Sequence, residues 1–120
     1  MKIAVTATGD GLEAEIDPRF GRCQKFVFVD TDTLETETID NQNVTAGGGA
    51  GVQSAQLVAN SGADTVLTGN CGPNAHQTLA AAGVTVIVGV RGTVRDAVER
   101  FKAGELSATN EPNVDTKFGV

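Results

Sequence analysis

The feature that most constrains the fold of this chain is an alternation of short apolar runs with segments of helical spacing. Glycine stands at nearly every junction between them. Runs of strand length, rich in β-branched residues, cover residues 2–8, 26–30, 64–68 and 84–88, and residues 35–39 alternate as an edge strand does. A tight polar connection at residues 31–33 joins two of these runs into a hairpin. The pattern therefore predicts five strands.

Three further segments carry apolar residues at the spacing of one helix face. They begin after the glycine-rich loop 41–51, at Pro73, and at an N-cap formed by Gly92 or Thr93. Strands and helices then follow in the order β-β-β-α-β-α-β-α, in which the last two strands run parallel to the first through right-handed crossovers. This order predicts an α/β fold, a mixed five-stranded sheet flanked by three helices.

Length and charge limit the functions that the chain can have. Its 120 residues suit one domain, predicted at residues 1–104, followed by an extended or mobile tail at residues 105–120. The net charge of −6 argues against nucleic acid or a membrane surface as the main partner. No apolar run is long enough to span a membrane, and the first residues form a strand and not a signal peptide. A cytoplasmic location with reduced cysteines is therefore expected.

Glycine-rich loops stand where the predicted strands end and the helices begin. The loops at residues 8–11, 69–72 and 89–92 are expected to meet at the carboxyl edge of the sheet, and Gly47–Gly51 precedes the first helix. Free N–H groups at helix starts attract anions, and glycine lets an anion approach the backbone closely. The alternative is that each loop is a tight turn without a ligand. No P-loop and no G-x-G-x-x-G follows the first strand, so the pattern does not indicate a nucleotide site.

Two arginines in the turn before the second strand are a further candidate for anion binding. Arg19 and Arg22 bracket Phe20 and Gly21, and guanidinium groups keep their charge and offer several N–H donors. The alternative interpretation is a solvated loop that carries surface arginines. A protein with a negative net charge can nevertheless have a local basic surface that binds an anion.

Cys23, Cys71 and His76 are the candidate metal ligands. Thiolates are soft ligands, and the position of Cys71 before a helix start predicts a lowered pKa. Neither cysteine belongs to a C-x-x-C pair, and His76 is the only histidine, so the alternative is that these residues have no ligand role. There is no serine nucleophile motif and no usefully spaced carboxylate pair, so we predict that the protein is not an enzyme.

Motifs spread in order over the whole chain resemble the dinitrogenase iron–molybdenum cofactor biosynthesis family. They are Lys2-Ile3-Ala4-Val5, Pro18-Arg19-Phe20-Gly21-Arg22 followed by Phe26, Asn41, Gly49-Ala50-Gly51, Gly69 with Gly72-Pro73-Asn74-Ala75, and Gly92 with Phe101-Lys102-Ala103-Gly104-Glu105-Leu106. The resemblance implies a ribonuclease-H-like fold and the binding or carrying of metal–sulfur cofactors without turnover. Many relatives have a histidine where this chain has Gly48, so ligation through that histidine is not expected here.

Cys23 after the Phe-Gly-Arg motif and the Asn70–Pro73 loop are similar to family members that hold a molybdenum–copper sulfide cluster non-covalently. The resemblance thus implies such a cluster, or a related molybdenum or iron–sulfur cluster, as the cargo. The predicted cluster-binding residues are Thr8, Arg19, Phe20, Gly21, Arg22, Gly48, Gly49, Gly51, Gly69, Asn70, Cys71, Gly72 and Gly92, with Cys71, Cys23 and His76 as candidate metal ligands.

Two other functions remain open at this point: a cofactor-free adaptor or regulatory module, and a site for another small anion such as phosphate. A nuclease is not expected, because two-metal catalysis needs carboxylates on the first strand and near the fourth, and the first strand has none. The negative net charge also opposes nucleic-acid binding. The expected partners are the cluster itself and proteins of cluster delivery or an ATPase-containing complex. The expected state is a monomer or weak dimer.

Overall fold

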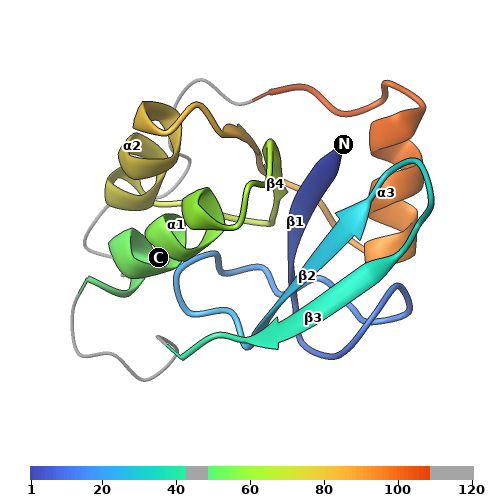
Figure 1. Cartoon of the computed structure of the whole chain (residues 1–120), viewed down its shortest axis with the longest axis horizontal. Helices are drawn as coiled ribbons and strands as arrows, with labels where there is room; N and C mark the ends of the chain where they lie inside the picture. The colour runs from blue at the N-terminus through green and yellow to red at the C-terminus, as the bar shows by residue number, and fades with distance from the viewer. Residues whose placement is uncertain (43–48, 109–120) are drawn as a thin grey trace.

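A computed structural model of the chain describes residues 1–42 and 49–108 (Figure 1). All eight predicted elements are present: β1 (Lys2–Ala7), β2 (Lys25–Asp30), β3 (Thr36–Asp40), α1 (Ala50–Asn60), β4 (Thr65–Leu67), α2 (Pro73–Ala81), β5 (Thr85–Ile87) and α3 (Val94–Lys102). The predicted bounds hold to within a residue or two.

The strands form one mixed sheet in the order β3-β2-β1-β4-β5. β1, β2 and β3 pair antiparallel, whereas β4 and β5 run parallel to β1. In the central strand Ala4 pairs with Phe28 on one side and with Val66 on the other. The predicted α/β class with a mixed five-stranded sheet and three helices is confirmed.

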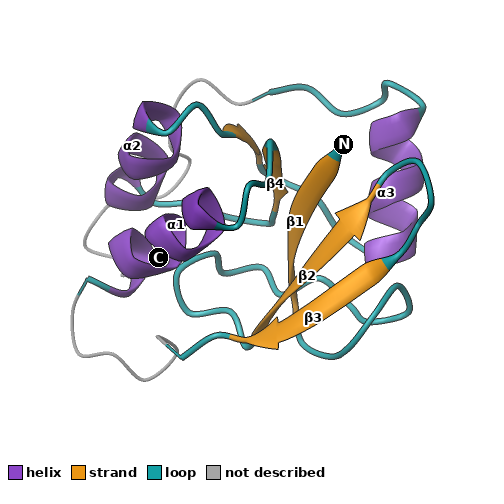
Figure 2. Ribbon diagram, in the orientation of Figure 1, coloured by secondary structure: helices purple, strands orange, loops and turns teal. Residues whose placement is uncertain are grey.

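Helices lie on both faces of this sheet, α1 and α2 on one face and α3 on the other (Figure 2), and an apolar layer fills each face. α1 and α2 pack on the face that presents Ala4, Phe26, Phe28, Val66 and Val86. α3 packs on the opposite face, against Ile3, Val5, Val27, Leu67 and Ile87. Burial of each large aliphatic side chain contributes about 1.5–3 kcal/mol, so the alternation along the strands fixes which helix covers which face. All three helices begin at the edge where β1, β4 and β5 end, α1 and α2 on one side of it and α3 on the other.

Residues 103–108 continue beyond α3 without a further helix or strand. Among residues 105–108 only Leu106 is partly buried, and it packs against the apolar layer of α3. Residues 109–120, which make up most of the predicted tail, lie outside the described residues. Within residues 1–42 and 49–108, no helix has the length and apolar character that a membrane span requires.

Candidate functional site

A single irregular segment, residues 15–22, crosses the carboxyl edge of the sheet from the start of α3 to the start of α1. At its beginning Glu15 pairs with Thr93 through an isolated β-bridge. The backbone N–H of Ile16 donates to the carbonyl oxygen of Gly92 at 2.9 Å. The loop that precedes α3 is therefore joined directly to the segment that carries the two arginines.

Further along, the same segment joins the loop that follows β4. The N–H of Phe20 donates to the carbonyl oxygen of Asn70 (3.1 Å), and Asn70 Nδ2 donates to the carbonyl oxygen of Pro18 (3.0 Å). The loops after β4 and β5 are joined in turn, because the N–H of Gly89 donates to the carbonyl oxygen of Gly69 at 2.9 Å. Of the three loops predicted to meet at the carboxyl edge, those after β4 and β5 are thus in direct contact, with residues 15–22 as the connecting strip. The third, residues 8–11, contacts this strip where the N–H of Thr8 donates to the carbonyl oxygen of Glu15 at 3.0 Å.

Two of the predicted site glycines allow close backbone contact with the arginine loop, as we name Pro18–Arg22. A Cβ atom on Gly21 would lie 2.9 Å from Cα of Gly51, in the first turn of α1. A Cβ atom on Gly69 would lie 2.7 Å from Cα of Pro18. Both positions exclude any side chain. These glycines therefore fit the arginine loop between α1 and the loop before α2.

Asp17 holds the arginine loop together, and sequence reasoning missed it. Its carboxylate is buried, with an exposed fraction of 2% for the side chain. It accepts hydrogen bonds from the N–H groups of Arg19 (3.0 Å) and Gln24 (3.1 Å) and from Arg19 Nε at 3.4 Å. The side chain of Arg19 remains 47% exposed. Asp17 thus orients a guanidinium group whose outer face is open to solvent.

Buried hydroxyl groups fix the start of the same loop to the sheet. The hydroxyl of Thr6, at the end of β1, donates to the carbonyl oxygen of Asp17 at 2.7 Å. It also lies 2.8 Å from the hydroxyl of Thr68, just after β4. Thr6 and Thr68 are fully buried, so these contacts are shielded from water.

The carbonyl oxygen of Gly21 is held by two further buried side chains. Asn41 Nδ2 donates to it at 3.2 Å, and the hydroxyl of Ser54 on α1 donates to it at 2.9 Å. Asn41 also donates to the carbonyl oxygen of Cys23 at 2.9 Å. Asn41 stands among the family motifs of the sequence, whereas no local pattern marks Ser54, whose partner is 33 residues away.

The three helix starts differ in how their N–H groups are satisfied. The N-cap residue of α1 is Gly49, in the left-handed conformation (φ 74°), and that of α2 is Gly72; neither helix has a side-chain cap in the part of the chain that the structure describes. At α3, by contrast, Thr93 and Asp96 form a complete capping box. Anion-binding capacity is therefore concentrated at the starts of α1 and α2, on the face that the arginine loop reaches.

The predicted site residues consequently divide into groups. Those gathered around the arginine loop and the starts of α1 and α2 are Arg19, Gly21, Arg22, Gly49, Gly51, Gly69, Asn70 and Gly72. Thr8 and Gly92 lie at the start of α3, where a Cβ on Gly92 would come within 3.0 Å of the Asp96 carboxylate. Phe20 points into the core against Phe26, with ring centroids 5.8 Å apart, and so anchors the loop. Gly48 lies outside the described residues.

The three candidate metal ligands all occupy buried positions. Cys23 and Cys71 are fully buried in the apolar layer under α1 and α2. His76 is also buried and lines a cavity of about 280 Å³ beside β5, together with Val84 and Val86. Within the described residues no three His, Cys, Asp or Glu side chains gather in a way that would hold a metal ion.

The expected lowering of the Cys71 pKa is wrong. Burial in apolar surroundings raises the pKa of the Cys71 thiol to about 12. Burial also raises the pKa of Cys23, and the nearby charge of Asp17 adds to this rise. The position of Cys71 before a helix start is as expected, but desolvation of the thiolate outweighs the attraction of the helix start. Both cysteines are therefore neutral thiols at physiological pH.

We accordingly expect both cysteines of the native protein to react at least about 100-fold more slowly with an aromatic disulfide reagent at pH 8 than in denaturant. The reaction needs thiolate, and raised pKa values keep both groups protonated at that pH. Peptide mass mapping of the modified protein would assign each site. Rapid labelling of Cys71 in the folded protein would contradict this account.

A profile of the dinitrogenase iron–molybdenum cofactor family matches residues 1–104. The chain belongs to this family. The resemblance drawn from the sequence motifs is therefore confirmed, and the matched region contains every element of the fold.

Individual family relatives match over most of their length. The apo form of the orange protein from Desulfovibrio gigas is 48% identical and superposes with a TM-score of 0.91, over 94% of this chain and 96% of that one. A putative NifB protein from Thermotoga is 30% identical, with a TM-score of 0.78 over 94% and 98% of the two chains. An uncharacterised protein of Methanocaldococcus jannaschii is 31% identical over 109 residues, 88% of this chain and 89% of that one.

Proposed function

We propose that the protein binds and carries an anionic molybdenum-containing metal–sulfide cluster, without catalysing a reaction. Its kinship with the orange protein and its family supports a role in metal-cluster binding. The observation that carries the proposal is the place of the arginine loop, which lies between the starts of α1 and α2, where the described residues provide no side-chain cap.

The donors at this place suit a sulfide-covered anion. Guanidinium groups and backbone N–H groups are hydrogen-bond donors only, and the sulfides of such a cluster are acceptors. Arg19 presents a half-exposed side chain, and Arg22 is partly buried beside it. The thiols of Cys23 and Cys71 are buried and protonated, which does not suit direct ligation of a metal. The cluster would thus be held by charge and hydrogen bonds, non-covalently.

Reconstitution tests this function directly. The full chain would be incubated with tetrathiomolybdate and a copper(I) salt, passed through a gel-filtration column, and examined by absorption spectroscopy and metal analysis. We expect a sulfide-to-metal charge-transfer band and both metals to elute with the protein. A colourless protein without metal would overturn the proposal and favour a cofactor-free adaptor.

Replacing both Arg19 and Arg22 with alanine is expected to weaken cluster retention about tenfold or more, because two charge-assisted donors are lost. The fold should survive, since the Asp17 carboxylate keeps the N–H groups of Arg19 and Gln24 as donors. Retention would be measured as charge-transfer absorbance after gel filtration at two salt concentrations, with circular dichroism as the check on folding.

The double variant Arg95→Ala with Lys102→Ala is the matched control, because it removes the same charge from α3. Arg95 is paired at the surface with Glu13, and Lys102 is exposed at the far end of that helix. We expect its retention to stay within about twofold of the wild type, as for other surface charges. Equal losses in the two double variants would show that only net charge matters, and that the arginine loop is no specific site.

A further inference from the structure

Arg91 occupies the same edge of the sheet as the arginine loop, although sequence reasoning gave it no role. It lies in the turn between β5 and α3, one residue before Gly92, whose carbonyl oxygen accepts the N–H of Ile16. Two residues earlier, Gly89 donates to the carbonyl oxygen of Gly69, the residue that packs against Pro18. Arg19 and Arg91 therefore stand on either side of the Gly69 backbone.

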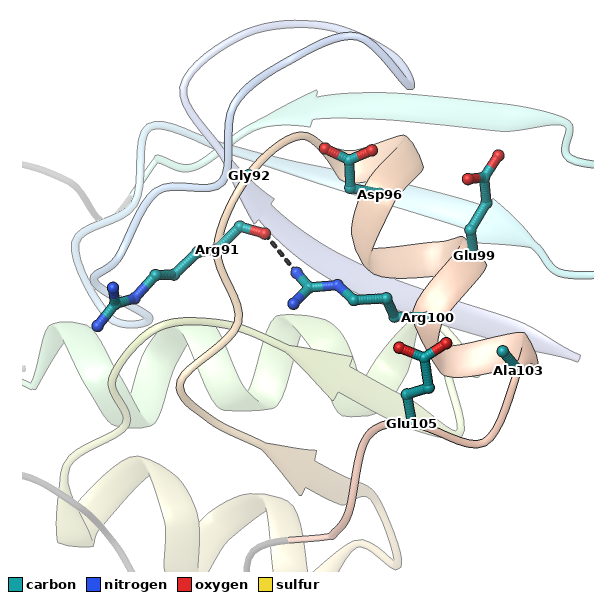
Figure 3. A pocket seen from close by; sticks show the side chains of 7 residues that line it. All are labelled: Arg91, Gly92, Asp96, Glu99, Arg100, Ala103 and Glu105. Carbon is teal, nitrogen blue, oxygen red and sulfur yellow. Dashed lines mark hydrogen bonds between the residues drawn. The ribbon is translucent and has the colours of Figure 1, made fainter.

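The backbone of Arg91 is fixed by another arginine. Arg100 Nη2, from the last turn of α3, donates to the carbonyl oxygen of Arg91 at 2.5 Å. Figure 3 shows that the guanidinium group of Arg91 extends away from the carboxylates of Asp96, Glu99 and Glu105, which lie on the other side of the turn. The charge of Arg91 is thus directed away from the acidic groups of α3.

The other basic residues of the described chain are occupied or distant. Lys25 pairs with Asp10 and Asp40, and Arg95 pairs with Glu13. Lys2 donates to the end of α1, at the opposite edge of the sheet. Arg91 is exposed and has no ion-pair partner among residues 1–42 and 49–108. In a protein with a net charge of −6, an unpaired arginine beside a basic loop adds to a local positive potential that attracts anions.

We propose that Arg91 is a third arginine of the cluster site, and that the site takes a polyanion long enough to reach guanidinium groups on both sides of Gly69. This inference rests on the proposed function and specifies its ligand. A compact mononuclear anion held at the arginine loop leaves Arg91 without contact, whereas a multinuclear cluster engages Arg19 at one end and Arg91 at the other.

The experiment compares wild type, Arg91→Ala and Lys102→Ala in two titrations, one with tetrathiomolybdate alone and one with tetrathiomolybdate plus copper(I). We expect Arg91→Ala to lower affinity for the copper-containing cluster about three- to tenfold, with a shallower dependence on salt. The same variant should bind tetrathiomolybdate alone as the wild type does. Lys102→Ala, which removes the same charge from the far end of α3, should match the wild type in both titrations.

Three outcomes would overturn the inference. Unchanged cluster binding by Arg91→Ala, with a loss on replacing Arg19 and Arg22, would remove Arg91 from the site and leave the proposed function standing. Equal weakening of the cluster and of tetrathiomolybdate would show that Arg91 does not distinguish the long anion from the compact one. Equal losses in Arg91→Ala and Lys102→Ala would reduce its effect to net charge. Failure of the wild type to take up any cluster counts against the proposed function itself.

Discussion

Replacing Gly69 with alanine is expected to lower the free energy of unfolding by about 2–3 kcal/mol and to displace the arginine loop. The new Cβ would lie 2.7 Å from Cα of Pro18 and 2.9 Å from its carbonyl oxygen. Both atoms belong to the backbone, so no side-chain rotation can relieve the contact. The loop must move away, and the hydrogen bonds between Asn70 and the loop are strained with it.

Chemical denaturation of Gly69→Ala beside Gly9→Ala would measure this effect. Gly9 is the matched control, because its backbone has no positive φ and its added Cβ would lie 3.6 Å from Ala14 Cβ, an ordinary contact. We expect Gly9→Ala to stay within about 0.5 kcal/mol of the wild type. Equal stability of the two variants would show that the loop does not depend on the close approach at Gly69.

Replacing Asp17 with alanine is expected to cost about 3 kcal/mol, the second large effect. The N–H groups of Arg19 and Gln24 would lose their acceptor at a position closed to bulk water. Asp17→Asn should cost less, because one amide oxygen still accepts, while its NH₂ group opposes one of the two N–H donors. The order of stability is therefore wild type, then asparagine, then alanine.

Asp64→Ala serves as the control for Asp17, because Asp64 is an exposed aspartate beside β4 and its variant should unfold as the wild type does. Thermal and urea unfolding would establish the order, and cluster retention at conditions where all variants are folded would report on the loop. If Asp17→Ala were as stable as Asp64→Ala, the buried carboxylate would have no part in building the arginine loop.

The fold could be read from the sequence because its signals are local. Strand 2–8 is apolar on both faces, as a central strand must be, and the exposed edge strand 35–39 alternates with polar residues. Glycine and Pro73 mark the helix starts. These features depend on neighbours in the chain, so composition and spacing were enough to place every element.

The site could be read only in part, because its architecture depends on contacts between distant segments. Arg19 and Arg22 were visible as a basic turn, but nothing local shows that Asp17 is buried beneath them or that Ser54 reaches Gly21. The expected lowering of the Cys71 pKa was wrong for the same reason. The position of Cys71 before a helix is a local feature of the sequence, whereas its burial depends on distant segments. The capping box of Thr93 and Asp96 is also local, although only an N-cap was predicted there. Because this box satisfies N–H groups at the start of α3, Gly92 is a weaker candidate for anion binding than the glycines at α1 and α2.

Because residues 15–22 contact several distant segments, the candidate site can form only after those segments have come together. The hairpin of β2 and β3 is a local structure, but the arginine loop is completed only when β4 has inserted beside β1 and brought Gly69 and Asn70 to it. Parallel pairing of this kind is non-local and therefore slow to form. An anion held there meets its full set of donors only in the finished domain, and its binding shifts the folding equilibrium towards that domain by mass action. On the proposed function, cluster binding and folding are therefore linked in this small protein, and retention of the cluster reports that the domain has folded.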